Sequence, residues 1–313
     1  MPEAALPCQS SWDRQVGIES FFFKTRTAVP DTGRTRTAVP DTGNPRTGFY
    51  LDESYFQRMR RSRIFLGILW AVLPEVSFAQ TAPRVILAIG AHAGDMELTT
   101  GALLIKQHKA GDKVVILHMT LGEGGNPKMS PAAYGAQKRR EALAADSVIG
   151  AESIFAPYKD GELPDDEAVR LYVANVIRQV KPAYVFTHWQ KSIHKDHART
   201  SAIVQDAVLL ASLEGVVTGT PAHRGIRGIW YAENWEDMED FQPYISVDVS
   251  NEMTQWRDAV TKYEFVRGGI STFRYLEYYD ALATVRGAVA GKQRAITFNI
   301  DAFGKRRVLD SLP

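Results

Sequence analysis

Residues 84–97 read RVILAIGAHAGDME, an uninterrupted apolar run that passes directly into a turn with polar side chains. Such a run is typical of a strand buried on both faces of a parallel sheet. Two further apolar runs, over residues 113–119 and 183–187, alternate along the chain with segments of helical spacing. Repeated strand–helix units predict an α/β fold of Rossmann-like type, with a mostly parallel sheet flanked by helices.

The predicted elements can be bounded by their apolar spacing and by the glycines that follow them. Helices are predicted over residues 98–110, 136–149, 165–180 and 197–213, and a short strand over 153–156. Beyond Gly225 the pattern is less regular, and we expect strands over 226–231 and 244–249 and a helix over 252–266.

The bulk composition excludes several classes of function. The 313 residues carry a formal net charge of +1, so nothing indicates a nucleic-acid partner. The single cysteine, Cys8, excludes structural disulfides and a Cys-rich zinc site. A transition metal would therefore be held by His, Asp and Glu side chains.

The first 79 residues differ in character from the rest. TRTAVPDTG occurs at residues 25–33 and again at 35–43. We assign no fold to residues 1–58, which we interpret as a non-native or disordered extension. Met59 is followed by arginines, an apolar run over 64–73, and Ser77 and Ala79, which is the pattern of a signal peptide over 59–79. Ten apolar residues fall short of the roughly 20 that span a bilayer. We expect a periplasmic or secreted domain, residues 80–313, with no stable membrane insertion after cleavage.

Two strand-to-helix turns carry histidines and carboxylates together. The first holds His92 and Asp95, and the second holds His194, Asp196 and His197. Ligands of open α/β sheets bind at the carboxyl ends of the strands, so these turns can meet there. Two histidines and one carboxylate make a catalytic zinc shell with an open position, although a single Asp of this kind could equally be a helix cap.

These residues resemble motifs of a known family. The first turn is similar to the A-H-P-D-D-x-E motif of the PIG-L, or LmbE-like, deacetylases, and the second to their H-x-D-H motif. The loop that begins at Thr120, the helix over 139–150 and the DGEL segment at 160–163 follow in the family's order. The resemblance implies a zinc-dependent hydrolase that removes an acetyl (N-acyl) group from an N-acetylglucosamine-like small molecule or glycoconjugate.

The resemblance also implies individual roles. Carried over by position, it gives three ligands for Zn²⁺: His92, Asp95 and His197. His194 would face the substrate and stabilise the oxyanion, and Asp196 would hold a histidine in the required tautomer. Glu123 and Glu97 would line or support the pocket. The catalytic groups implied are thus His194, Asp196 and Glu123.

The sequence departs from the family at one position of the first motif. The first Asp, which acts there as general base, is replaced by Gly94, and the preceding Pro by Ala93. A general base contributes about 10²–10⁴-fold to the rate. Either Glu123, Glu97 or Asp196 supplies the proton relay, or the substrate needs less help, or the protein is a non-catalytic zinc-containing carbohydrate-binding protein. If the base is simply missing, Gly94→Asp should raise turnover.

An aromatic and acidic stretch over residues 230–241 is a candidate wall of the substrate pocket. Trp230, Tyr231 and Trp235 could stack on a sugar ring, or they could be ordinary core and rim aromatics.

Overall fold

The computed structural model describes residues 82–237, 239–302 and 304–306. The predicted extension over 1–58 and the predicted signal peptide over 59–79 lie outside these residues. Within them, no helix combines the length and the apolar character that a membrane span requires.

The described residues form one seven-stranded sheet in the order β3-β2-β1-β4-β5-β7-β6. Its strands are β1 (Val85–His92), β2 (Lys113–Thr120), β3 (Ala151–Phe155), β4 (Tyr184–His188), β5 (Ile229–Ala232), β6 (Ile245–Asp248) and β7 (Ala295–Ile300). The five strands from β3 to β5 are parallel, and β7 runs antiparallel to both β5 and β6. The predicted α/β fold with a mostly parallel sheet is confirmed.

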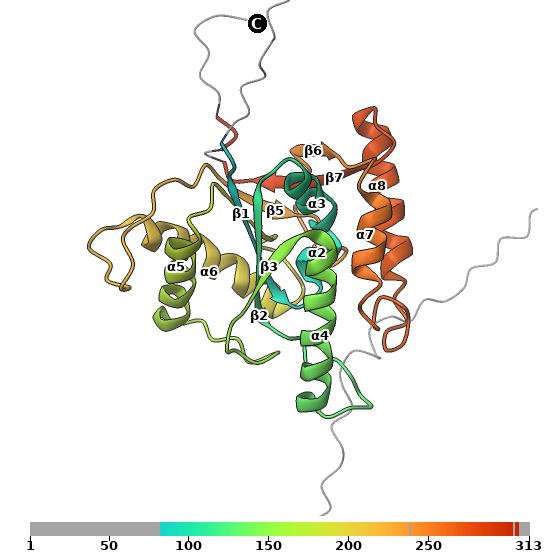
Figure 1. Cartoon of the computed structure of the whole chain (residues 1–313), viewed down its shortest axis with the longest axis horizontal. Helices are drawn as coiled ribbons and strands as arrows, with labels where there is room; N and C mark the ends of the chain where they lie inside the picture. The colour runs from blue at the N-terminus through green and yellow to red at the C-terminus, as the bar shows by residue number, and fades with distance from the viewer. Residues whose placement is uncertain (1–81, 238, 303, 307–313) are drawn as a thin grey trace, which may run out of the picture. The chain divides into compact units, whose positions relative to one another are not determined.

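Helices cover both faces of the sheet (Figure 1). They are α2 (Asp95–Thr99), α3 (Gly101–Lys109), α4 (Pro131–Ile149), α5 (Glu167–Val180), α6 (Lys195–Ser212), α7 (Met253–Val260) and α8 (Tyr275–Ala290). In β1, Leu87 and Ile89 belong to the apolar cluster that includes α5 and α6, whereas Ile86 and Ala88 belong to the cluster that includes α2, α3, α4 and α7. Because both faces are buried, the strand is apolar at nearly every position.

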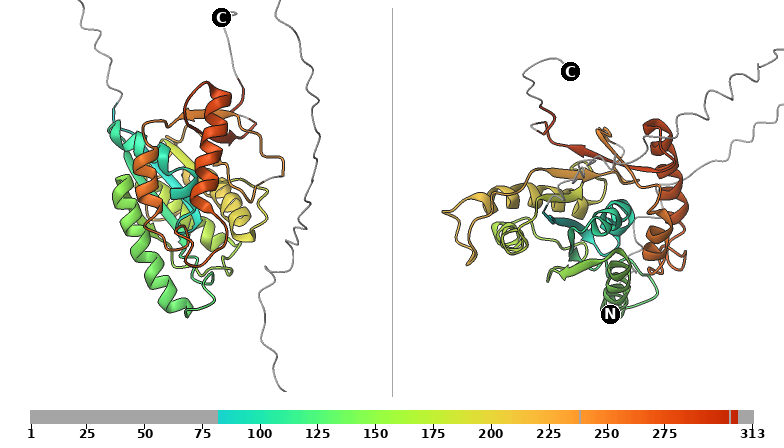
Figure 2. Two further views of the ribbon diagram at one scale, coloured as in Figure 1. Left: turned by 90° about the vertical axis from the view of Figure 1, so that its right-hand side faces the viewer. Right: turned by 45° about the horizontal axis from the view of Figure 1, so that its top comes forward.

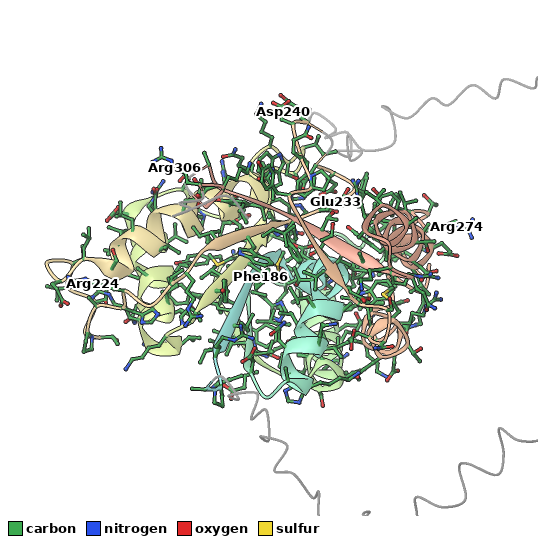
Figure 3. The ribbon with its side chains drawn as sticks, turned by 90° about the horizontal axis from the view of Figure 1, so that it is seen from above. Phe186, Arg224, Glu233, Asp240, Arg274 and Arg306 are labelled. Carbon is green, nitrogen blue, oxygen red and sulfur yellow. The ribbon has the colours of Figure 1, made fainter. Side chains whose placement is uncertain are left out.

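The C-terminal third differs most from the prediction. The helix expected over 252–266 ends at Val260, and α8 and β7 were not predicted. β7 inserts between β5 and β6, where Phe298 packs against Phe186 of β4 at 5.2 Å between ring centroids. Figure 2 shows α7 and α8 together on one side of the sheet, and Figure 3 shows Phe186 in its interior. The irregular apolar pattern here reflects a strand that pairs with partners distant in sequence.

The chain reverses its direction of winding at β1. From β1 it proceeds outward through β2 to β3, and it then returns to the other side of β1 to form β4. The carboxyl ends of β1 and β4 therefore flank a topological switch point, which is where open α/β sheets bind their ligands.

Candidate metal centre

The turn after β1 folds tightly around one carboxylate. β1 ends at His92, and Gly94 has a φ of 111°, in the left-handed region that favours glycine. α2 then begins at Asp95, whose Oδ2 accepts a hydrogen bond from the His92 backbone N–H at 2.7 Å. This bond fixes the Asp95 carboxylate beside the imidazole of His92.

The turn after β4 brings three more histidines to the same place. β4 ends at His188, and His194 is the N-cap residue of α6. The Nδ1 atom of His194 accepts a hydrogen bond from the backbone N–H of Asp196 at 3.2 Å. His197 lies in the first turn of α6 and is nearly fully buried.

The three predicted ligands place one atom each at the corners of a nearly equilateral triangle. His92 Nδ1 lies 3.3 Å from Asp95 Oδ2 and 3.2 Å from His197 Nε2, and His197 Nε2 lies 3.3 Å from Asp95 Oδ2. A tetrahedral zinc ion with bonds of about 2.0–2.1 Å sets its ligand atoms about 3.3–3.4 Å apart. The donor types and the spacing both fit such an ion. We call these three residues the ligand triangle.

Carboxylates lie behind the histidines of the ligand triangle. The outer nitrogen of His92, Nε2, lies 3.1 Å from Asp160 Oδ1 and 3.7 Å from Asp196 Oδ2. On the other histidine, Nδ1 of His197 lies 2.9 Å from Glu236 Oε2. A carboxylate in this position keeps the proton on the outer nitrogen and leaves the inner nitrogen available for a metal.

Asp160 and Glu236 are functional candidates that the sequence analysis missed. Asp160 stands in the DGEL segment that was matched to the family without a role, and Glu236 stands in the stretch interpreted as a pocket wall. Asp196, which was predicted to fix a histidine tautomer, is fully buried and accepts a hydrogen bond from Gly161 N at 2.7 Å. Of the two carboxylates that face His92, Asp160 is the closer.

His188 and His194 flank the ligand triangle. The ring of His188 stacks on His197 with 4.0 Å between centroids, and its Nε2 accepts a hydrogen bond from Ala91 N at 2.9 Å. The Nε2 atom of His188 is therefore already used as a hydrogen-bond acceptor and is not available to a metal, although it lies 3.2 Å from Asp95 Oδ2. The ring of His194 lies 4.7 Å from the rings of both His92 and His197. This placement suits a group that faces a substrate.

The charges of the site favour a bound cation. Burial alone would raise the pKa of Asp95, but the neighbouring His197 and His92 hold it well below its usual value. Burial alone would lower the pKa of His197, but Asp95 and Glu236 raise it to about 9. Burial, together with the neighbouring His197, lowers the pKa of His188 to about 4. The centre thus attracts positive charge, which protons or a metal ion can supply.

Glu123 and Glu97 lie behind the site. Glu123 Oε1 accepts a hydrogen bond from the backbone N–H of Asp160 at 3.0 Å, so this side chain positions the carboxylate that faces His92. Glu97 is fully buried and accepts hydrogen bonds from Gly94 N at 3.2 Å and from the hydroxyl of Tyr263. Glu123 therefore helps to position Asp160, and Glu97 helps to position the turn at Gly94.

Of the two interpretations of the aromatic stretch, the structure supports ordinary packing for two of its three members. Trp230 is partly buried and packs among the rings of Tyr184, Phe186 and Phe298, against the apolar cluster of one sheet face. Tyr231 is buried in the cluster of the opposite face. Successive residues of β5 point to opposite faces, and both faces are covered by helices. Trp235, which follows the strand, stacks on Phe273 with 4.5 Å between ring centroids.

Comparisons with known proteins agree with this fold. The 4-oxalmesaconate hydratase of Pseudomonas putida KT2440 is 23% identical over 225 residues, which make up 69% of this chain and 85% of that protein. The structure of GalB, the 4-carboxy-2-hydroxymuconate hydratase of Pseudomonas putida KT2440, matches with a TM-score of 0.66 at 21% identity, covering 74% of this chain and 100% of GalB. N,N'-diacetylchitobiose deacetylase from Pyrococcus horikoshii matches with a TM-score of 0.63 at 19% identity, covering 81% of this chain and 94% of the deacetylase.

A family model matches the part of the chain that carries the ligand triangle. Residues 87–208 match the model of PIG-L, described as GlcNAc-PI de-N-acetylase. The matched segment runs from within β1 to within α6, and it includes both strand-end turns. The match agrees with the resemblance of both turns to the motifs of the PIG-L deacetylases, and the solved structures named above share the fold.

Proposed function

We propose that this protein is a zinc-dependent hydrolase that removes an acetyl or similar acyl group from the nitrogen of an N-acetylglucosamine-like substrate. The observation that carries the proposal is the ligand triangle of His92, Asp95 and His197, whose edges of 3.2–3.3 Å suit a tetrahedral ion with one open position. The resemblance of both turns to the deacetylase motifs supports the same reaction.

In this proposal the chain's own residues orient the reaction. Zinc held by the triangle would supply a Lewis acid that polarises the amide carbonyl and favours ionisation of water. Asp160 and Glu236, whose carboxylates lie 3.1 Å and 2.9 Å from the outer nitrogens of His92 and His197, would favour the tautomers that carry the proton on those nitrogens. Because Nδ1 of His194 accepts from the Asp196 backbone, the neutral ring carries its proton on Nε2, from which it donates to the developing oxyanion.

The test is amine release by the zinc-loaded full chain. N-acetylglucosamine, N,N'-diacetylchitobiose and an N-acetylglucosaminyl phospholipid are offered, and the free amine is measured with an amine-reactive fluorophore. We expect release from at least one of these compounds. The control is the chain in which His197 is replaced by alanine, which should release none. No release by protein with full zinc occupancy would overturn the proposal and favour a non-catalytic zinc-containing carbohydrate-binding protein.

A second candidate function is hydration of a carbon–carbon double bond. It is favoured by the relative in Pseudomonas putida, whose name is that of a hydratase. The same protein is therefore offered a conjugated unsaturated tricarboxylic acid, and the loss of its ultraviolet absorbance is followed. Hydration without amine release would replace the deacetylase proposal.

We further propose that residues 59–79 direct export, so that the reaction occurs in the periplasm or outside the cell. The basis is the arginine-flanked apolar run with small residues at the cleavage position.

A further inference from the structure

The proton acceptor for the proposed reaction is not among the carboxylates around the ligand triangle. Asp160 and Asp196 face the outer nitrogen of His92, and Glu236 faces the outer nitrogen of His197. Each of them therefore lies behind a ligand and away from the open side of the triangle. Glu123 is further from the triangle, because its carboxylate accepts a hydrogen bond from the backbone N–H of Asp160. The group that takes a proton from water in the proposed reaction must therefore be a different side chain, one that does not lie behind a ligand.

The space in front of Gly94 is occupied by a phenyl ring and an amine. A Cβ atom on Gly94 would lie 2.9 Å from Cζ of Phe265 and 3.6 Å from Nζ of Lys138. In the family motif this position carries the general-base Asp, so its side chain would project toward these two groups. The amine of Lys138 thus lies where the absent carboxylate would have extended.

Lys138 is held at this place by contacts from several elements. It comes from α4, is only 4% exposed, and donates from Nζ to the backbone oxygen of Ala93 at 2.5 Å. Its Nζ also lies 4.1 Å from the ring centroid of Phe265 and 4.7 Å from that of Tyr263. Among the described residues, no carboxylate oxygen lies within ion-pair distance of Nζ. A buried amine without a close counter-ion is a candidate for proton transfer.

We propose that Lys138 is the proton-transfer group of this site and takes the place of the carboxylate that Gly94 lacks. The inference rests on the proposed hydrolase function. The neutral amine accepts a proton from water as the water oxygen forms its bond to the acyl carbon. When the carbon–nitrogen bond breaks, the resulting ammonium returns the proton to the departing nitrogen, so Lys138 ends as it began. A neutral amine keeps two hydrogens, and one of them can retain the bond to Ala93.

The electrostatics of Lys138 agree with this role. Burial lowers the pKa of Lys138 to about 8, although nearby carboxylates act in the opposite direction. The titratable groups that face it are Asp95 and Glu97 of α2, His118 of β2, Glu141 of α4, Asp160 after β3 and Tyr263 after α7. An amine of this pKa is partly neutral at pH 7 and mostly neutral above pH 9, as a general base requires.

The decisive variants are Lys138→Met and Lys138→Arg. Methionine keeps an apolar stem of similar length. Arginine keeps the positive charge and can still donate to Ala93, but the pKa of its guanidinium lies too far above neutrality for it to act as a base. We expect both to lower kcat by about 10²–10⁴-fold, with zinc content unchanged. In the wild-type chain kcat/KM should rise with pH through about 8 as the amine becomes neutral, and this rise should be absent in both variants.

A readout independent of turnover is the titration of Lys138 itself. The ¹³Cε signal of lysine-labelled protein, assigned with Lys138→Met, should titrate near pH 8. A midpoint at or above the ordinary value of about 10.4 would overturn the role of Lys138. Wild-type activity that survives in Lys138→Arg with its pH dependence intact would also overturn it, while leaving the hydrolase proposal in place. Absence of amine release from the zinc-loaded wild-type chain overturns both proposals together.

Gly94→Asp is the complementary variant. The φ of 111° disfavours any side chain, the new Cβ would press on Phe265, and the new carboxylate would pair with Lys138. We therefore expect turnover to fall by at least 10-fold, in contrast to the gain expected if a base were simply missing. Gly94→Ala is the matched control, since it carries the same backbone and steric cost without the charge. A gain in turnover for Gly94→Asp would contradict the role of Lys138.

Discussion

Replacement of His197 by alanine is expected to abolish stoichiometric zinc binding by the full chain. His197 contributes one of the three atoms of the ligand triangle, at 3.2 Å from His92 Nδ1 and 3.3 Å from Asp95 Oδ2. With two ligands left, the affinity should fall by more than the roughly 10–100-fold that changes behind the ligands cost. Amine release should fall with it, because the ion supplies the Lewis acid of the proposed reaction.

The measurement is elemental analysis after dialysis against a dilute zinc buffer, combined with thermal unfolding. A ligand present at 100 times its Kd stabilises the folded state by about 2.7 kcal/mol, so zinc should raise the Tm of the wild-type chain and leave that of His197→Ala unchanged. His108→Ala is the control, because His108 is an exposed histidine of α3 outside the site. Equal zinc content in the wild-type chain and His197→Ala would show that the metal binds elsewhere.

The prediction of the site depended on where parallel strands end. β1 and β4 are adjacent in the sheet, so the polar residues that follow them had to meet, whatever the details of the intervening chain. That rule indicated from sequence alone that the two turns could meet, and the resemblance to the deacetylase motifs then selected His92, Asp95 and His197 within them. It could not place Asp160 or Glu236, because both approach from loops whose path depends on long-range packing.

The fold, like the site, could be predicted in part: the central strands were predicted, and the strand that pairs with distant partners was not. Strands buried on both faces produce apolar runs that need no knowledge of their partners, and the runs at residues 84–90 and 113–119 correspond to β1 and β2. β7 is different, since its antiparallel position between β5 and β6 is decided by partners far away in sequence. The role of Trp230 stayed open for a related reason, because an aromatic residue of a covered strand has the same sequence signature as one that lines a pocket.

The meaning of Gly94 also required the structure. From the sequence, the glycine in the place of the base left three interpretations open: a base supplied by another residue, a substrate that needs less help, or a protein that binds without catalysis. The contacts show that the space is filled by Phe265 and by the amine of Lys138, which comes from a helix to which the sequence assigned no catalytic role. Position 94 and position 138 are 44 residues apart, so no local pattern could have joined them.

Replacement of Arg178 by methionine is expected to cause a large loss of stability without an effect on the site. Arg178 of α5 is 2% exposed, and its guanidinium donates to six oxygens around the end of α6 and the segment that follows. These acceptors are the backbone oxygens of Leu210, Ala211, Leu213, Val216 and Thr220 and the hydroxyl of Thr218. Among the described residues, no carboxylate lies within ion-pair distance of this guanidinium.

The expected cost follows from the acceptors that would lose their partner. A buried polar group left without a hydrogen bond costs about 1–3 kcal/mol, and several of these oxygens lie near enough to the surface to recover water. We therefore expect the free energy of unfolding to fall by about 3–5 kcal/mol in denaturant titrations at constant zinc, with an unchanged m-value. Arg224→Met is the matched control, because Arg224 also donates to a backbone oxygen of α6, that of Ser212, but is exposed. That control should change stability by less than about 0.5 kcal/mol.

A loss below about 1 kcal/mol for Arg178→Met would contradict this prediction. It would mean that water replaces the guanidinium at nearly every acceptor, and that the end of α6 keeps its structure without Arg178.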